Sequence, residues 1–248
     1  ELDNESLCIA AHPLNPVPLL QWLFLKRGKW REKDILHKNL SGLQILNGCL
    51  DKGYYQGLSF WIKLLLKGYH KFIYAGNDAH GNFNIYRQIK IPMLSLYEKK
   101  EQLFGEFRTG VSFEDNKRDL YSTISSLKSG KCFVTNGPFI KMTCHVNDSI
   151  YEMGSTILSN NGLIIIYIIS TPEFGKIKKM VIKKGILGDN SETDCFAIIN
   201  PEKYELDNKY EVYADSNCYY RCEVELESDG PVKRFALTNP IWFEVIVE

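Results

Sequence analysis

The chain has 248 residues, of which 44% are hydrophobic and 24% charged, a composition typical of a globular protein. Its 30 Lys and Arg residues balance its 30 Asp and Glu residues, which argues against nucleic acid or an anionic membrane as the main partner. The longest apolar run, residues 162–170, has the length of a buried strand, so we expect no membrane span.

The sequence begins at Glu1, and its first residues resemble the run into a strand. We therefore expect a piece of a longer chain, and the absence of a signal-like segment carries no information about export. The charge balance suits the cytoplasm, and export stays open. The seven cysteines are odd in number and lack a paired spacing, which does not indicate a disulfide framework.

The first part of the chain alternates between apolar runs of strand length and segments with apolar residues at helical spacing. Strand, helix, strand, helix, strand is the order that produces parallel strands. Polar side chains follow the strands, at the edge where α/β proteins place their chemistry. The expected strands are 6–13, 41–48 and 71–80, the expected helices are 16–28 and 54–68, and the strand-end residues are His12, Asn47, Asp78 and His80.

The second part begins with an irregular stretch, 81–113, followed by an expected helix over 116–130 and a strand over 131–139. After about residue 140, short apolar or alternating runs are separated by Asn, Gly and Pro, which predicts an antiparallel β-sandwich. We therefore expect two domains, an α/β domain over 1–140 and a β-sandwich over 141–248.

Asp78 and His80 are the most suggestive pair of polar residues. Residues two apart in a strand point to the same face, so a carboxylate and an imidazole can converge on one zinc, manganese or iron ion. His12, at the end of another expected parallel strand, strengthens this metal-site hypothesis. The alternative interpretations are a chance D-x-H in which the histidine caps a helix or turn, and a His12 bonded to a backbone carbonyl.

Three segments, "IAAHP", "LQILNG" and "AGNDAHG", resemble in that order the last motifs of the PHP (polymerase and histidinol phosphatase) superfamily of metal-dependent hydrolases. The segments "FRTGV", "SLKSGKCFVTNGPF" and "ALTNPIWFEV" are similar to its CehA/McbA-like branch. The resemblance implies the C-terminal part of a distorted (β/α)7 barrel, which in its complete form holds up to three divalent metal ions (Zn, Mn or Fe), followed by a small antiparallel β-sandwich.

The resemblance also implies roles for individual residues. His12 matches the ligand of the third motif, and Asp78 and His80 match the ligands of the fourth, with Asp78 and His80 as the catalytic pair. The family's His-x-His motif and its mid-barrel Glu and His ligands have no counterpart in this sequence, and Gln44 stands where relatives often carry Glu. Gln is a poor metal ligand.

This resemblance predicts a hydrolase that uses metal-activated water to cleave a phosphoester or another ester. Because several ligands are missing, we expect an active enzyme only when the N-terminal half of the barrel is supplied, and an inactive chain without it. Arg108, Thr135 and Asn136 are candidates for binding the substrate, against the alternatives of a surface arginine and an ordinary strand end.

A second interpretation is a non-catalytic or degenerate module of the same family, for which Gln44 and the missing motifs argue. In this interpretation the β-sandwich binds a carbohydrate or a protein partner. Its tyrosines are the available aromatic material: Tyr204, Tyr210, Tyr213, Tyr219 and Tyr220.

Overall fold

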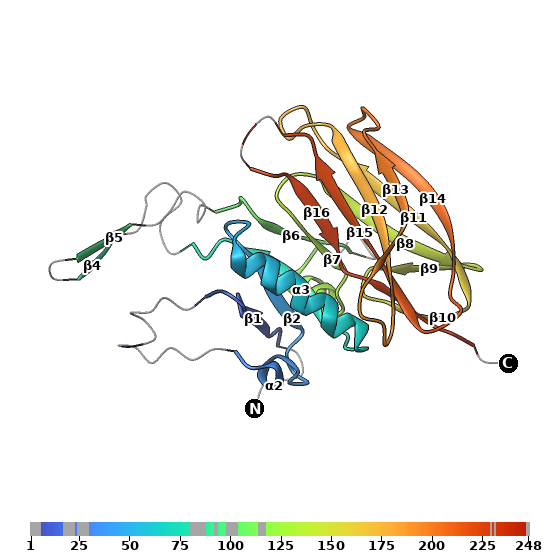
Figure 1. Ribbon diagram of the computed structural model, residues 1–248, viewed down its shortest axis with the longest axis horizontal. Coiled ribbons are helices and arrows are strands. Elements are labelled where there is room, and N and C mark those ends of the chain that lie inside the picture. The colour runs from blue at the N-terminus through green and yellow to red at the C-terminus, as the bar shows by residue number, and fades with distance from the viewer. Residues whose placement is uncertain are drawn as a thin grey trace.

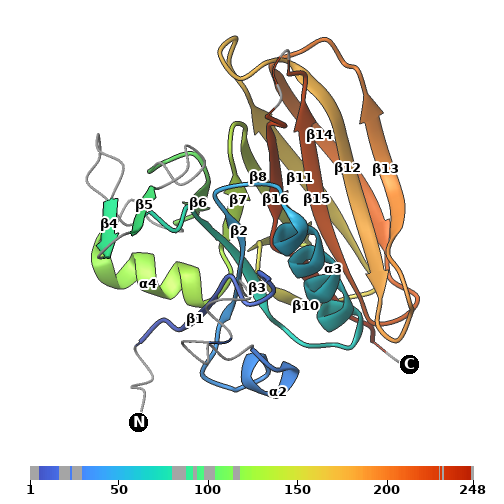
Figure 2. The same cartoon turned by 60° about the vertical axis from the view of Figure 1, so that its left-hand side comes forward.

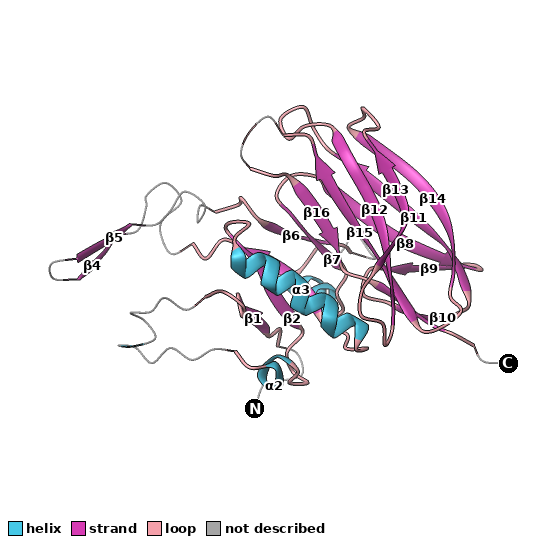
Figure 3. Ribbon diagram, viewed as in Figure 1, coloured by secondary structure: helices cyan, strands magenta, loops and turns pink. Residues whose placement is uncertain are grey.

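The structure is a computed structural model that describes residues 6–16, 23, 30–79, 88–91, 94–97, 104–113, 118–228, 230 and 232–246 (Figure 1). It is mostly β, with 45% strand and 15% helix (Figure 3). The strands form a small parallel sheet, a large sheet, a four-stranded sheet and a two-stranded hairpin. Two hydrophobic cores lie between these layers.

The N-terminal layer is a parallel sheet of three strands in the order β1 (Ile9–Ala11), β2 (Gly42–Asn47) and β3 (Phe72–Gly76). Each lies within a segment that the apolar runs predict as a strand. The short helix α2 (Glu32–Ile35) precedes β2, and its Ile35 is buried. The parallel order places the carboxyl ends of all three strands at one edge of the sheet.

Helix α3 (Lys52–Leu66) connects β2 to β3. It begins where the Asp51 carboxylate accepts a hydrogen bond from the Tyr54 amide, and it is followed by Gly68, whose φ of 83° suits glycine. Its apolar face carries Trp61, which is fully buried, and Gly57, which packs directly on Ile45 of β2. This packing fixes the helix on one face of the parallel sheet.

The expected (β/α)7 barrel is wrong, because no sheet closes into a barrel within the described residues. At the edge of β3, where a fourth parallel strand would pair, side chains bind the backbone instead. The Ile73 amide donates to Asn239 Oδ1 at 2.8 Å, and the Ala75 amide donates to Thr109 Oγ1 at 2.9 Å. These side chains accept hydrogen bonds from the backbone amides to which a closing strand would have to pair.

The chain after β3 joins sheets in which most strand pairs are antiparallel. Strands β4 (Gln88–Ile91) and β5 (Leu94–Tyr97) form a hairpin, and helix α4 (Leu120–Lys128) separates β6 (Arg108–Val111) from β7 (Cys132–Thr135). β6 pairs with β7, and β7 pairs with β16 near the C-terminus. The strands just before residue 140 therefore belong to the same sheet as strands after it, and the division of the chain near that residue stays a prediction.

The two remaining sheets pack face to face (Figures 1 and 2). The four-stranded sheet has the order β14–β11–β8–β9, and the large sheet runs β10–β17–β15–β16–β7–β6, with β12 and β13 attached to β15. The strands are β8 (Phe139–Val146), β9 (Ser149–Glu152), β10 (Thr156–Leu158), β11 (Asn161–Ile169), β12 (Ile177–Ile186), β13 (Thr193–Ile199), β14 (Glu205–Tyr213), β15 (Cys218–Leu226), β16 (Phe235–Thr238) and β17 (Ile241–Glu244).

Every second side chain along the strands points into the core between these two sheets. Ile164, Ile166 and Ile168 of β11 are fully buried, and they meet alternate residues of β15 such as Cys222 and Val224. Because side chains of a strand alternate between faces, the other residues of β15 point to the opposite side of the large sheet.

Helix α3 covers that opposite side, so it lies between the parallel sheet and the large sheet (Figure 2). Arg221 of β15 is fully buried there, with its guanidinium carbon 5.4 Å from the centre of the Trp61 ring. Its Nε and Nη2 atoms donate to Glu192 at 2.7 and 2.6 Å, and Nη2 also lies 2.7 Å from Glu223. Tyr219 donates to the same Glu192 carboxylate at 2.9 Å. This buried ion-pair network joins the helix, β15 and the loop after β12.

None of the seven cysteines, which all lie within the described residues, is in a disulfide. Burial raises the pKa of Cys132 and Cys144 to about 12 and that of Cys218 to about 11, and it also raises the pKa of Cys222. Because the thiolate is the reactive form, these four thiols combine poor access with a very small thiolate fraction.

We therefore expect iodoacetamide at about pH 8 to leave these four cysteines unmodified in the folded protein and to modify them in urea. Cys195 is exposed and should be alkylated first in the folded state. Peptide mapping by mass spectrometry measures the modified fraction at each cysteine. Rapid alkylation of Cys132 or Cys222 in the folded protein would contradict the packing described above.

Candidate functional site

The candidate site lies at the carboxyl edge of the three-stranded parallel sheet. His12 directly follows β1, and Asp78 follows β3 by two residues. β2 lies between these strands, with Ala11 opposite Gln44 and Gln44 opposite Tyr74. The parallel order therefore brings residues from distant parts of the sequence to one place.

The structure brings the side chains of His12 and Asp78 together. His12 Nε2 lies 3.6 Å from Asp78 Oδ1, which is longer than a hydrogen bond. Side-chain exposure is 17% for His12 and 31% for Asp78, so both groups are shielded on most sides but still open to a ligand. The two side chains therefore converge at the edge of the sheet without a hydrogen bond between them.

Both residues have an unusual backbone conformation. The φ angle is 31° at His12 and 52° at Asp78, in the left-handed region that residues with a Cβ seldom adopt. Such a conformation costs on the order of 1 kcal/mol or more and is frequent at functional sites. A residue with this conformation therefore follows each of the two strands, and the two side chains approach each other.

The spacing of the two donor atoms fits a divalent metal ion. An imidazole nitrogen and a carboxylate oxygen, each about 2.0–2.2 Å from one ion, lie roughly 3–3.6 Å apart. The observed 3.6 Å is at the upper end of this range. A neutral imidazole and a carboxylate are also a donor set that suits Zn²⁺, Mn²⁺ and Fe²⁺. These two residues therefore fit two ligands of such an ion.

Neighbouring loops hold the two residues in place. The Asn15 amide donates to the His12 carbonyl at 3.2 Å in a tight turn, and Asn15 abuts Gly53 at the start of α3, where a Cβ would lie 2.1 Å from its side-chain oxygen. On the other side, the Asn77 side chain forms two hydrogen bonds with the backbone of Phe107, at 2.8 and 3.0 Å. The large sheet thus anchors the segment that carries Asp78.

Gln44 sits in the middle of the sheet, below this edge. Its Nε2 donates to Asn47 Oδ1 at 3.0 Å and to the Leu46 carbonyl at 3.3 Å. A Cβ on Gly76 would lie 2.8 Å from the same nitrogen, so the small residue on β3 makes space for the Gln44 amide. Gln44 therefore orients the Asn47 side chain at the end of β2.

His80 lies outside the described residues, so its expected place beside Asp78 stays a prediction. Among the residues that the structure describes, no group of three or more His, Cys, Asp or Glu side chains is arranged to hold a metal ion. The described part of the site therefore consists of two potential ligands, His12 and Asp78.

Arg108, a candidate for substrate binding, is exposed at the start of β6. Its guanidinium carbon lies 5.7 Å from the centre of the Phe174 ring, and that of Arg234 lies 5.5 Å from the same ring. Arg234 is paired with Glu106 at 2.7 Å. Contact with Phe174 favours a packing role for Arg108, and its role in substrate binding stays a prediction.

Thr135 and Asn136 are buried at the end of β7. Thr135 Oγ1 donates to the Pro138 carbonyl at 2.7 Å, and Asn136 bonds the backbone on both sides of Arg234, at the Lys233 carbonyl and the Phe235 amide. These bonds satisfy the polar side-chain atoms within the turn and favour a structural role. Their expected contact with substrate stays a prediction.

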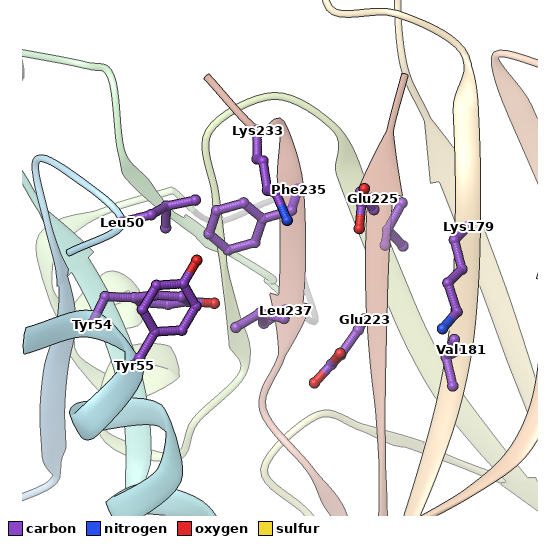
Figure 4. A pocket seen from close by; sticks show the side chains of 11 residues that line it. Leu50, Tyr54, Tyr55, Lys179, Val181, Glu223, Glu225, Lys233, Phe235 and Leu237 are labelled. Carbon is purple, nitrogen blue, oxygen red and sulfur yellow. The ribbon is translucent and has the colours of Figure 1, made fainter. Parts of the chain in front are cut away.

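A pocket beside the start of α3 was not predicted from the sequence. Tyr54 and Tyr55 line one wall of this pocket, and Glu223 and Phe235 of the large sheet line the other (Figure 4). Two adjacent tyrosines in the first turn of the helix were the local signal for an aromatic surface. Their partners lie about 170–180 residues further along the chain, and no local pattern identifies them.

The described residues include no helix that is both long and apolar enough to span a membrane. Comparisons of the whole sequence with known proteins give no further identification: no family model and no curated protein matches the chain.

Proposed function

We propose that the chain contributes His12, Asp78 and His80 as ligands to the divalent-metal site of a hydrolase of the PHP type, which cleaves a phosphoester or another ester. The observation that carries this proposal is the approach of His12 Nε2 to Asp78 Oδ1 at 3.6 Å, at the carboxyl edge of adjacent parallel strands. The left-handed backbone at both residues supports it, because strain of this kind is retained where it serves a site.

The residues of the chain have separate tasks in this proposal. A divalent ion held here supplies Lewis-acid chemistry, polarising the ester and lowering the pKa of water. The Asp78 carboxylate has a second oxygen that can accept a proton from the attacking water, and His12 fixes the position of the site at the end of β1. The partial exposure of both side chains lets an ester approach from solvent.

Further ligands must come from elsewhere, because a catalytic zinc site usually has three protein ligands in addition to water. His80 is the proposed third ligand. A dinuclear or trinuclear centre needs additional carboxylates or imidazoles, which we propose are supplied by a separate polypeptide segment. We accordingly expect the chain by itself to bind metal weakly and to turn over esters slowly or not at all.

Paramagnetic broadening by Mn²⁺ tests the metal site directly. During a titration, the imidazole signals of His12 and His80 in the NMR spectrum should broaden first, because Mn²⁺ relaxes only nearby nuclei. His145 on β8 is the internal control and should stay sharp until much higher Mn²⁺ concentrations. Simultaneous broadening of all five histidines would mean non-specific binding and would refute the proposal.

Hydrolysis is tested on the protein in its native form, using 4-nitrophenyl phosphate, bis(4-nitrophenyl) phosphate and 4-nitrophenyl acetate with Mn²⁺ or Zn²⁺. The expected result is turnover of at least one ester that is lost with a chelator and restored by metal. Specific metal binding without turnover of any of the three would instead support the non-catalytic interpretation.

One observation favours that second interpretation. Gln44 is neutral, and its amide nitrogen is already committed to Asn47 and Leu46. If the site is degenerate because a carboxylate is missing here, Gln44→Glu should tighten Mn²⁺ binding. If Gln44→Glu leaves the affinity for Mn²⁺ unchanged, this argument for a degenerate site no longer holds.

A further inference from the structure

The pocket beside α3 is a second candidate site, separate in its residues from His12 and Asp78. Its volume is about 180 Å³. An engineered cavity of about 150 Å³ accepts benzene, so the space is suitable for a ligand built on one ring. Figure 4 shows tyrosine side chains from α3 on one side and side chains from β16, β15 and β12 on the other.

The pocket exists because α3 covers only part of the outer face of β15. Arg221 lies beneath Trp61 and is fully buried, whereas Glu223 and Glu225, further along the same face, border the pocket. The strand register places Phe235 and Lys179 on either side of Glu225. The outer face of β15 is therefore buried beneath α3 at one end, and at the other end it lines a pocket together with aromatic and charged side chains.

Aromatic rings line both sides of the pocket. The Tyr54 ring centre lies 5.0 Å from that of Tyr55 and 5.8 Å from that of Phe235. Burial, followed by the nearby charge of Glu223, raises the pKa of Tyr54, so its hydroxyl stays protonated and can donate a hydrogen bond. Tyr55 is 55% exposed, which leaves its ring open for stacking.

The carboxylates that line the pocket have cationic partners, whereas its two lysines have no anionic partner within the described part of the chain. The Glu223 carboxylate lies 2.7 Å from Arg221, and the Glu225 carboxylate lies 2.8 Å from Lys178, so each already has a cationic partner. Lys179 and Lys233 also line the pocket, and within the described part of the chain neither ammonium group has an ion pair or a hydrogen bond. Because Arg221 also pairs with Glu192, Arg221, Lys178, Lys179 and Lys233 stand against three carboxylates, those of Glu192, Glu223 and Glu225, and the net charge of these groups is positive.

We propose that this pocket binds a small anion carrying a flat ring, with the ring against Tyr55 and Phe235 and the acidic group paired with Lys179 and Lys233. An aryl carboxylate is the simplest member of this class. Stacking supplies the apolar contact, and the two lysines select an acid over an amine of the same shape.

Binding of 4-fluorobenzoate, followed by ¹⁹F NMR of the ligand, tests the proposal. We expect saturable binding with a dissociation constant of about a millimolar, as is usual for a single-ring ligand. 4-Fluorobenzylamine has the same ring and the opposite charge and should bind at least about 5-fold more weakly. Acetate has the charge without the ring and should compete poorly. Stronger binding of the amine would show that Glu223 and Glu225 dominate, and would overturn the proposal.

Variants locate the binding. The double variant Lys179→Gln/Lys233→Gln should weaken binding of 4-fluorobenzoate at least about 5-fold, and Tyr55→Ala should weaken both fluorinated ligands. Lys209→Gln makes the same change on β14 of the four-stranded sheet and should have no effect. Urea unfolding of each variant confirms that it is folded. Unchanged affinity in a folded double variant would place the ligand elsewhere and refute the assignment.

Discussion

Replacing Glu192 by Ala is expected to lower the free energy of unfolding by about 3–5 kcal/mol, because it leaves the buried Arg221 guanidinium without its main partner. Arg221 is fully buried, and Glu192 contacts it through both carboxylate oxygens while its own side chain is only 6% exposed. Burial acts to lower the pKa of Arg221, but the charges and hydrogen bonds of Glu192 and Glu223 outweigh it and raise the pKa overall. Because arginine is not deprotonated in proteins, the guanidinium stays charged when Glu192 is removed. Urea denaturation followed by circular dichroism measures the loss.

Asp194→Ala is a matched control for this experiment. Asp194 lies two residues further along and pairs with Lys183 at 2.6 Å, but its side chain is 50% exposed. An exposed ion pair contributes about 0–1 kcal/mol, so its loss should be small. The double variant Glu192→Leu/Arg221→Met, which removes both charges, should recover much of the lost stability. Equal losses for Glu192→Ala and Asp194→Ala would show that Arg221 is not buried as described.

The second large effect concerns the proposed metal site. Asp78→Asn and His12→Gln should each weaken Mn²⁺ binding at least about 10-fold, because each removes one of few ligands while keeping the size of the side chain. Both residues are polar and partly exposed, so the loss of affinity should come without a large loss of stability. Mn²⁺ affinity is measured by water-proton relaxation or isothermal titration calorimetry.

Asp148→Asn and His145→Gln are the controls for these two variants, since they make the same chemical changes around the turn between β8 and β9. Neither should alter Mn²⁺ affinity. If Asp78→Asn and His12→Gln bind Mn²⁺ as tightly as the unchanged protein, the close approach of these two side chains does not serve metal binding.

Local patterns in the sequence predict the elements around this site well. The segment 41–48 contains β2 (Gly42–Asn47), and the predicted helix over 54–68 differs from α3 (Lys52–Leu66) by two residues at each end. The difference at the start arises from Asp51, whose capping carboxylate sets the first turn before the apolar pattern begins. Placing strand ends at one edge also accounts for the approach of His12 to Asp78.

The arrangement of sheets could not be predicted in the same way. The barrel prediction came from the resemblance to the PHP superfamily and requires β3 to pair within a closed sheet, whereas Asn239, located 166 residues after Ile73, occupies the edge of that strand. The placement of β6 and β7 likewise depends on β16 at the other end of the chain. Burial of Arg221 depends on Trp61 and Glu192, which no spacing connects. Contacts between residues so far apart in the chain are decided by packing, and they leave no periodic pattern in the sequence.

The side-chain contacts along the outer edge of β3 also bear on self-association. An open strand edge can recruit a strand from a second molecule and so begin an aggregate. Thr109 and Asn239 hold the outward-facing amides of Ala75 and Ile73, and they come from a sheet that stays folded around them. This edge therefore offers no template for intermolecular β-pairing as long as the large sheet is intact.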